Sequence, residues 1–480
     1  MVFSSVTFLV YFLPIVVCLY YLAPAGMRNL LLLVMSLFFY AWGEPVYVIL
    51  MIFSILLNYL TGIGLDYALY NKPSVTKLIV GINVLLNLSI LGFFKYADFV
   101  INNINSIFDA NIELLNLPLP IGISFYTFQA MSYVIDLYRG KVYVQKDFIA
   151  FGTYIALFPQ LIAGPIVRFK SIEEQLVHRE HAWDKFSEGA KIFIIGMGKK
   201  VILANNIGML WDNIAGSDVG NLSVATAWLG AIAFTMQIYF DFSGYSDMAI
   251  GLGKIFGFDF PKNFDYPYLS RSITEFWRRW HISLSSWFKE YVYVPLGGNR
   301  KGLNRQLVNI LIVWSLTGLW HGASWNFVIW GMYFAVILIA EKIFLGNALA
   351  TLEEKAGFAG KVLTSCYAMF VVVISWVIFA SEDLNFVINY VGNLFGLGNV
   401  QFFDSFAYYA IHNYWIILVT CIVGATKMPA IVGYIFLNRV LEEAPRISKA
   451  FETIALLLVL LISFAYIVAS TYNPFLYFRF

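Results

Sequence analysis

The chain has 480 residues, of which 60% are hydrophobic and 12% are charged, and its formal net charge is +2. Soluble domains carry roughly 25% charged residues, so the composition excludes an ordinary soluble enzyme and predicts a polytopic membrane protein. The net charge is too small to favour a nucleic-acid partner, because such proteins carry strongly basic surfaces.

Apolar segments predict where the chain crosses the bilayer, since one crossing takes roughly 20 residues. Candidate spans lie near residues 6–24, 29–42, 46–67, 76–100, 121–138, 148–166, 187–211, 223–250, 306–320, 324–345, 362–380, 406–425 and 452–472. The first begins without Lys or Arg, so we expect a retained span and not a cleaved signal peptide. No repeat or linker divides the chain, which predicts one integral membrane domain over residues 1–480.

The distribution of positive charge predicts the orientation of these spans. Lys and Arg gather at residues 168–200 and 278–305, and the positive-inside tendency places both stretches in the cytoplasm. Arg28, Lys72 and Lys77 predict further cytoplasmic loops near the start of the chain. The N-terminus is therefore expected outside.

Two prolines and two aspartates interrupt otherwise apolar segments. Pro120 and Pro165 free backbone groups, which predicts a re-entrant or broken helix that lines a cavity. Asp241 and Asp247 lie in the span near 223–250, where carboxylates must be paired, protonated or in contact with water. Both are expected to line the interior, and pairing with Arg or Tyr is an equally good explanation of their presence.

Residues 270–293 differ from the spans around them. Apolar side chains recur there at helical spacing, with charged side chains between them: Trp277, Trp280, Leu284, Trp287 and Phe288 alternate with Arg278, Arg279, Lys289 and Glu290. This pattern predicts an interfacial helix on the cytoplasmic face. His281 in its middle favours a functional role over a merely amphipathic one.

Only five histidines occur in the chain. His178, His181 and His412 have charged or polar neighbours and are expected at a solvated surface, whereas His281 and His321 are not explained in this way. His321 lies between two apolar stretches, and an ionisable group inside the bilayer costs about 2.5 kcal/mol or more without a partner or water. It is therefore the first candidate for a catalytic residue, although a membrane histidine that only hydrogen-bonds a neighbour would give the same pattern.

The neighbours of His321 predict space for a ligand. Small residues thin the helix packing on both sides of it, and tryptophans can enclose the space: Gly318, Gly322, Ala323 and Ser324, with Trp320, Trp325 and Trp330. Asn326 suits two roles, because it can orient an imidazole or a substrate carbonyl, or cap a helix.

The motifs of several enzyme classes are missing from the sequence. It contains no G-x-S-x-G, Walker A, H-E-x-x-H or C-x-x-C pattern, and His178 with His181 lacks a third ligand nearby, so no metal is expected. The three cysteines lie far apart in apolar surroundings and are read as packing residues. A histidine with a pKa near neutrality can instead accept the proton of a hydroxyl, which suits group transfer to an alcohol.

Five runs of residues together resemble the membrane-bound O-acyltransferases, in particular the branch of bacterial alginate and peptidoglycan O-acetylation. They occur in family order between residues 119 and 326: residues 119–128 (LPIGISFYTF), 158–168 (FPQLIAGPIVR), 237–247 (QIYFDFSGYSD), 276–285 (FWRRWHISLS) and 318–326 (GLWHGASWN). The resemblance implies an all-α fold, a ring of roughly 11–13 transmembrane or re-entrant helices around a central tunnel.

The resemblance also assigns roles to residues. His321 corresponds to the family's catalytic histidine, as general base or as the group that positions the acceptor hydroxyl, and His281 to a second histidine that supports substrate or shapes the chamber. Four cations are expected at the phosphates of acetyl-coenzyme A, with lipid-headgroup contacts as the alternative: Arg168, Arg278, Arg279 and Lys289. The tunnel is expected to be lined by Trp320, Ser324, Trp325, Asn326, Tyr239, Asp241, Ser243 and Asp247.

These features predict an O-acetyltransferase of the bacterial cytoplasmic membrane. It would take acetyl from cytoplasmic acetyl-coenzyme A and deliver it, through an extracytoplasmic SGNH-type partner transferase, to a polysaccharide, most readily an alginate-like exopolysaccharide. Peptidoglycan is the alternative acceptor. A rival from another class is a transporter or flippase, which would use His321 as a proton relay with Asp241 or Asp247, and a third option is a structural scaffold that tolerates loss of His321.

Overall fold

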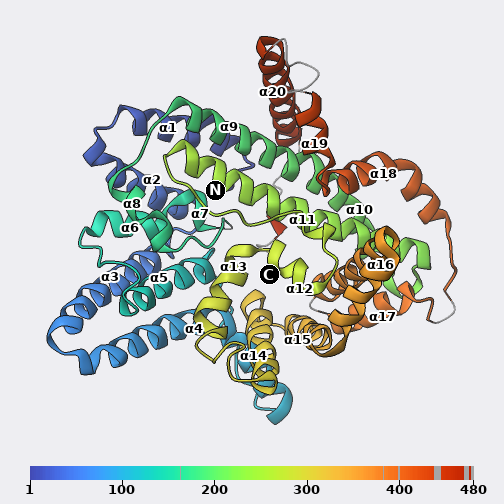
Figure 1. Cartoon of the computed structure of the whole chain (residues 1–480), viewed down its shortest axis with the longest axis horizontal. Coiled ribbons are helices and arrows are strands. Elements are labelled where there is room, and N and C mark those ends of the chain that lie inside the picture. Colours follow the sequence, from blue (N-terminus) through green and yellow to red (C-terminus); the bar gives the residue numbers. More distant parts are fainter. Residues whose placement is uncertain (163, 382, 398–399, 437–444, 470–474, 477–480) are drawn as a thin grey trace. The chain divides into compact units, whose positions relative to one another are not determined.

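The computed structural model describes residues 1–480 except 163, 382, 398–399, 437–444, 470–474 and 477–480. Within the described residues all regular secondary structure is helical (Figure 1), which confirms the predicted all-α class. Seven helical stretches of the described chain are long and apolar enough to cross a membrane: Ala25–Gly43, Val48–Asn71, Pro73–Phe108, Trp183–Ala215, Trp325–Phe379, Ser405–Gly424 and Arg446–Ala469. The protein is therefore a multi-pass membrane protein.

The chain folds into two compact units. The first comprises residues 1–193 and 245–261, and the second comprises residues 194–244 and 262–480. One long helix, α11 (Val224–Ile255), contributes to both. The single domain expected over residues 1–480 remains a prediction.

The first unit is built around helices at the N-terminal end of the chain. Its helices are α1 (Leu13–Leu22), α2 (Arg28–Gly43), α3 (Val48–Asn71), α4 (Thr76–Phe108), α5 (Ile123–Tyr138), α6 (Phe148–Ala156), α7 (Phe158–Leu161), α8 (Phe169–Val177) and the start of α9 (Trp183–Gly198). Nearly every residue of α5 is buried, and this helix packs against α3, α4, α6 and α8. With 16 residues, α5 is an interior helix of this unit.

Pro120 lies just before α5 and Pro165 lies between α7 and α8, so both prolines are outside helices, and the cavity predicted beside them stays a prediction. Gly122 takes a left-handed conformation (φ 75°) just before α5, where a Cβ would lie 2.7 Å from the carbonyl oxygen of Leu161. The expected span 148–166 is divided into α6 and α7, and Pro159 lies at the start of α7. Glycine is required at position 122 because other residues disfavour both this φ and this close approach.

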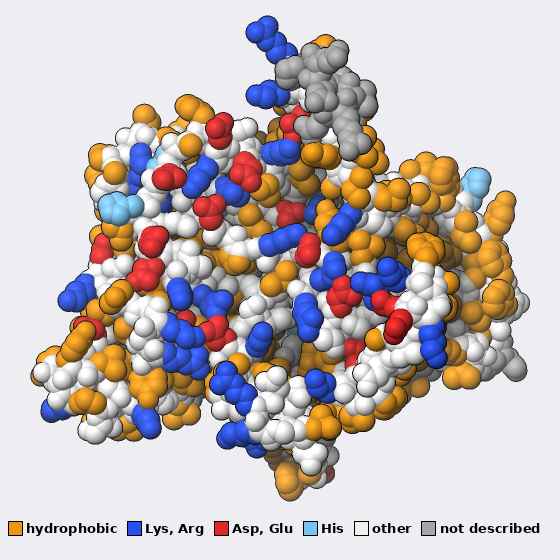
Figure 2. Space-filling model, in the orientation of Figure 1, with side chains coloured by type: hydrophobic (Ala, Val, Ile, Leu, Met, Phe, Trp, Pro, Cys, Tyr) orange, Lys and Arg blue, Asp and Glu red, His pale blue; other side chains and the backbone are white. Residues whose placement is uncertain are grey.

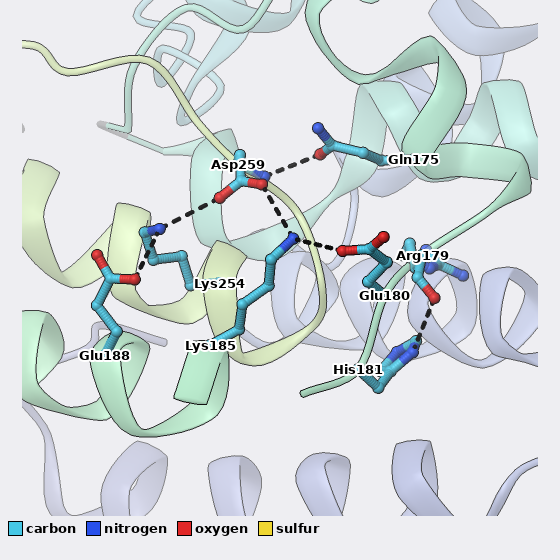
Figure 3. Close-up of polar contacts among 8 residues, drawn as sticks. All are labelled: Gln175, Arg179, Glu180, His181, Lys185, Glu188, Lys254 and Asp259. Carbon is cyan, nitrogen blue, oxygen red and sulfur yellow. Dashed lines mark hydrogen bonds and ion pairs between the residues drawn. The ribbon is translucent and has the colours of Figure 1, made fainter. Parts of the chain in front are cut away.

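Charges of the basic stretch 168–200 are balanced by acids in the first unit. Figure 3 shows Asp259 between Lys185 (3.5 Å) and Lys254 (3.2 Å), with Lys254 also 3.2 Å from Glu188 and Lys185 3.7 Å from Glu180. This part of the stretch is a mixed-charge surface, and pairs of this kind contribute little stability individually.

His181 is not the solvated residue that its polar neighbours predicted. It is half-buried, with Nε2 2.8 Å from the Tyr20 hydroxyl and Nδ1 3.1 Å from both Arg28 Nη1 and the carbonyl oxygen of Arg179 (Figure 3 draws the last of these). Sequence neighbours missed this because Tyr20 is 161 residues away. The other two histidines that were expected at a solvated surface, His178 and His412, are exposed, as predicted.

The second unit carries the C-terminal helices. They are a π-helical turn (Lys199–Ala204), α10 (Asn205–Ala215), most of α11, α12 (Ile273–Arg279), α13 (Ile282–Phe288), α14 (Leu303–His321), α15 (Trp325–Ala340), α16 (Gly346–Phe379, kinked at Gly357), α17 (Leu384–Leu394), α18 (Ser405–Gly424), α19 (Met428–Ile435) and α20 (Pro445–Ala469). Large apolar side chains lie exposed along α18, as on α3 of the first unit (Figure 2). Such faces suit contact with lipid.

The single interfacial helix predicted over residues 270–293 is wrong. The chain forms two short helices, α12 and α13, which meet at Trp280 and His281, and His281 takes a left-handed conformation (φ 43°). The aromatic side chains of this segment are buried against the second unit and do not form an exposed apolar face. Helical spacing identified the buried apolar positions, but it did not reveal the break at His281 or that these side chains pack against protein.

The hairpin of α14 and α15 depends on glycines at its contact. A Cβ at Gly318 would lie 2.3 Å from the carbonyl oxygen of Phe327, and one at Gly331 would lie 2.4 Å from that of Trp314. The two helices therefore approach as closely as their backbones allow, as small residues permit in membrane helix pairs. Gly318 lies one helical turn before His321.

Substituting Gly318 by Ala should force this hairpin apart. Overpacking of this kind costs about 1–3 kcal/mol, so we expect a lower unfolding temperature in detergent by scanning fluorimetry. Gly81→Ala is the matched control, because no atom lies within 4 Å of a Cβ there. Equal unfolding temperatures for the two variants would contradict the close contact.

Candidate active site

His321 is the last residue of α14 and lies inside a cage of aromatic rings. Its side chain is only 6% exposed. Its ring centroid lies 5.0 Å from that of Trp320, 5.0 Å from that of Trp330 and 5.2 Å from that of Phe379. Burial of this imidazole, predicted from the apolar flanks, is confirmed.

A small cavity of about 20 Å³ adjoins His321. It is lined by Ile238, Asp241, Phe242, Trp280, His321, Trp376, Phe379, Phe475 and Leu476. A space of this size holds roughly one water-sized group. His321 is the titratable nitrogen base on its wall, so a small reactant in this cavity would contact the imidazole directly.

His281 is buried more deeply, at the break between α12 and α13, where it is 1% exposed. Its Nδ1 lies 3.1 Å from Asn263 Oδ1, which also accepts hydrogen bonds from the Ser283 backbone N–H (3.2 Å) and hydroxyl (2.9 Å). Because a backbone N–H only donates, this atom of Asn263 is the amide oxygen, and Nδ1 of His281 carries the proton. Nε2 is then an acceptor, and it has no hydrogen-bond partner among the described residues.

The two histidines occupy different positions relative to the cavity. His281 does not line the small cavity. Its ring centroid lies 4.7 Å from that of Phe242, and Phe242 is a residue of the cavity wall. Trp320 lies against both imidazoles, with ring centroids 5.9 Å from His281 and 5.0 Å from His321. Burial lowers the pKa of His281 to about 3, so this imidazole is neutral at physiological pH.

Asp241 forms a buried ion pair with Lys200, and each side chain is at most 4% exposed. Its Oδ2 also accepts a hydrogen bond from the Leu476 backbone N–H (2.7 Å). Lys200, expected on the cytoplasmic surface with its basic neighbours, is instead an interior residue of the second unit. Asp247, the other aspartate of α11, is half-buried in the first unit.

Two of the four cations expected at the donor phosphates share one cavity. Arg278 and Lys289 line a space of about 290 Å³, together with Thr274, Trp277, Leu284, Ser285, Phe288, Tyr293, Ile310, Val313, Trp314, Thr317 and Leu338. Arg279 is engaged elsewhere, since its Nη2 donates to Glu275 (2.7 Å) and its Nη1 to the carbonyl oxygen of Asp265 (3.2 Å). Arg168 begins α8 in the first unit.

A short run of rings connects this larger cavity with His321. Trp277, on the wall of the larger cavity, has its ring centroid 5.6 Å from that of Trp330. Trp330 in turn lies 5.0 Å from His321. The cationic cavity and the histidine are thus separated by two tryptophan side chains.

The remaining residues expected along a path occupy varied positions. Trp320, Tyr239, Ser243 and Asn326 are buried, Ser324 is half-buried, and Trp325 is 52% exposed. Asn326 Nδ2 donates to the carbonyl oxygen of Ile378 (3.4 Å). Of the whole predicted set, Asp241 is the residue that shares the small cavity with His321, and the lining roles of the others stay predictions.

Comparison with known proteins places the chain in a family. Residues 144–377 match the model of the membrane-bound O-acyltransferase family. The chain is 38% identical to the probable alginate O-acetylase AlgI of Azotobacter vinelandii over the full length of both proteins. It belongs to the membrane-bound O-acyltransferase family. It is therefore an acyltransferase, as the resemblance predicted.

Two further relatives of this acyltransferase differ in what their names say of the acceptor. The probable alginate O-acetylase AlgI of Pseudomonas putida is 44% identical over 406 residues, which cover 84% of this chain and 81% of the relative. The peptidoglycan O-acetyltransferase of Helicobacter pylori is 31% identical and is covered over 98% of its length.

Sequence reasoning missed several residues of this acyltransferase's candidate site. Asn263 hydrogen-bonds His281, Lys200 pairs with Asp241 of the cavity wall, and Phe475 and Leu476 line the small cavity. A lysine within the apolar stretch 187–211 was the one available signal, and its neighbour Lys199 made it resemble the edge of a loop.

Glu341 fixes the start of α12 from the end of α15. Its buried carboxylate accepts hydrogen bonds from the backbone N–H groups of Ile273 (2.6 Å) and Thr274 (2.9 Å), from the Thr274 hydroxyl (2.7 Å) and from the Tyr367 hydroxyl (3.2 Å). A carboxylate is favoured at a helix N-terminus, where the unpaired N–H groups point. Because Trp280 of the cavity wall directly follows α12, Glu341 helps to position that wall.

Replacing Glu341 by Gln should loosen α12, because an amide NH₂ would then face one of these donors. Leaving a buried donor unsatisfied costs about 1–3 kcal/mol, so we expect a lower unfolding temperature and reduced transfer activity. Glu354→Gln, at an exposed position of α16, serves as the control. If Glu341→Gln unfolds at the same temperature as this control, the positioning role is wrong.

Proposed function

We propose that this acyltransferase moves acetyl groups from cytoplasmic acetyl-coenzyme A to a hydroxyl acceptor, for O-acetylation of a polysaccharide outside the bacterial cytoplasmic membrane. The observation that carries the proposal is the buried His321 on the wall of a small cavity of about 20 Å³. Family membership supports acyl transfer as the reaction. The names of the relatives support acetyl as the transferred group and a polysaccharide as the acceptor.

His321 is the proposed general base. Its imidazole takes the proton of the acceptor hydroxyl while the hydroxyl oxygen attacks the thioester carbonyl. A carbon–oxygen bond forms, the carbon–sulfur bond breaks, and the departing thiolate regains the proton from the imidazolium. The enclosed aromatic surroundings support this assignment, because they keep bulk water from competing as an acceptor.

His281 has a supporting role in this proposal. Its neutral ring lies behind Phe242 and Trp320 and does not line the small cavity. A fixed Nδ1–H tautomer leaves Nε2 able to accept a hydrogen bond. We assign it to the shape and polarity of the chamber and not to the proton transfer itself.

Arg278 and Lys289 are the proposed contacts for the donor's phosphates. Both are exposed side chains on a cavity whose remaining wall is mainly apolar and aromatic, which suits an anionic group followed by an uncharged arm. The thioester would approach His321 past Trp277 and Trp330. Arg168 and Arg279, predicted to share this role, are not assigned to it.

The proposed acceptor is an alginate-like exopolysaccharide, reached through an extracytoplasmic SGNH-type partner transferase. Identities of 38% and 44% to alginate O-acetylases favour this acceptor over peptidoglycan, the acceptor named for the relative at 31%. Recovery of label on peptidoglycan instead of exopolysaccharide would select the second acceptor. A proton-relay transporter is less well supported, because Asp241 is already paired with Lys200.

Replacing His321 by Ala should abolish transfer. Loss of a general base lowers rates by roughly 10²- to 10⁴-fold. We therefore expect the rate of polysaccharide labelling to fall at least about 100-fold. The assay uses inside-out vesicles supplied with labelled acetyl-coenzyme A, acceptor and partner. His412→Ala changes an exposed histidine of α18 and should retain full activity. Equal labelling by the two variants would remove His321 from the mechanism.

Replacing Arg278 and Lys289 together by Ala should weaken donor binding. Both cations lie outside the small cavity, so we expect a KM for acetyl-coenzyme A raised about tenfold or more with kcat little changed, which corresponds to about 1.4 kcal/mol of binding. Lys342→Ala, at another exposed cation of the second unit, is the control. An unchanged KM in the double variant would place the donor's phosphates elsewhere.

A further inference from the structure

Two described residues from the C-terminal part of the chain, Phe475 and Leu476, form part of the wall beside His321. Phe475 and Leu476 line the small cavity and are 3% and 7% exposed. The Phe475 ring centroid lies 5.7 Å from that of Phe242, another wall residue. These two residues thus shield one side of the small cavity from solvent.

This part of the wall is held by a buried polar contact. The Leu476 backbone N–H donates to Asp241 Oδ2 (2.7 Å), and Asp241 is paired with Lys200. Hydrogen bonds to an ionised carboxylate are stronger than those between neutral groups. Removing one partner of a buried ion pair costs several kcal/mol of stability. Phe475 is therefore fixed beside the cavity by a contact that joins residues 235 positions apart.

The small volume of the cavity beside His321 limits the group that it can accept. About 20 Å³ accommodates little more than one water-sized group, which suits the methyl end of an acetyl group. A longer acyl chain at this position would meet the aromatic part of the wall, which is formed by Phe242, Trp280, Trp376, Phe379 and Phe475. Packed interiors resist such insertions at a cost of about 1–3 kcal/mol.

We propose that Phe475, held in place by the contact of Leu476 with the Asp241–Lys200 pair, determines the acyl specificity of the enzyme by restricting the group at His321 to two carbons. The inference rests on the proposed function, since it concerns the same cavity and the same transfer. Phe475 is then a specificity determinant and takes no part in bond making.

The test compares Phe475→Ala with the wild type, using acetyl-, propionyl- and butyryl-coenzyme A in the same vesicle assay. We expect the ratio of propionyl to acetyl transfer to rise at least tenfold in Phe475→Ala, and less in Phe475→Leu. Phe344→Ala, at an exposed phenylalanine of the same unit, should keep the wild-type ratio. The double variant Asp241→Leu/Lys200→Met, which removes the contact that holds Leu476, should shift the ratio in the same direction.

The outcomes separate this inference from the proposed function. A wild type that transfers acetyl, together with an unchanged ratio in Phe475→Ala, overturns the specificity role alone. A wild type that transfers no acyl group from any of the three donors overturns both. If Phe475→Ala and Phe475→Leu fold with normal unfolding temperatures but are inactive with every donor, Phe475 does more than limit size and the proposal is wrong.

Discussion

The hydrogen bonds of Asn263 across the break between α12 and α13 are the constraint on which the candidate site depends. The backbone carbonyl of Asn263 accepts from the Ile282 N–H (2.9 Å), and its side-chain oxygen accepts from Ser283 and His281. These bonds stabilise a left-handed residue that would otherwise cost free energy of order 1 kcal/mol or more. They place Trp280 on the small cavity and His281 behind it. Without this break, α12 and α13 would form one continuous helix, and their aromatic rings would be distributed around its axis.

Low dielectric explains why the buried carboxylates of Asp241 and Glu341 have close polar partners. Asp241 is matched by Lys200 and by the Leu476 N–H, and the Glu341 carboxylate accepts four hydrogen bonds. Unpaired charges in such surroundings are expensive. The same surroundings make a buried imidazole a useful base, because water is excluded and proton transfer can occur only with a group that enters the cavity. Structural and chemical requirements thus coincide around His321.

Local sequence patterns predicted the features that depend on local chemistry. The all-α membrane class and the burial of His321 follow from composition and apolar flanks. The small residues beside His321 predicted space for a ligand, but Phe327 packs directly against Gly318 and Gly322. Three features did not follow. The break at His281 depends on Asn263, 18 residues away, the interior position of Lys200 depends on Asp241, and the wall formed by Phe475 and Leu476 depends on contact with α11. Periodicity carries no information about such distant partners. The alternation of aromatic and charged residues over 270–293 therefore predicted an exposed face where the fold supplies a buried one.

The central claim is that acyl transfer takes place at His321, within the small cavity of the second unit. The most direct measurement is a cryo-electron microscopy structure with an acetyl-coenzyme A analogue in which a methylene replaces the thioester sulfur. The account predicts the analogue's carbonyl carbon in the small cavity, within about 4 Å of a His321 ring nitrogen, close to the range in which polar atoms interact directly. It also predicts the phosphates near Arg278 and Lys289. An analogue bound with its carbonyl remote from His321 would contradict the account.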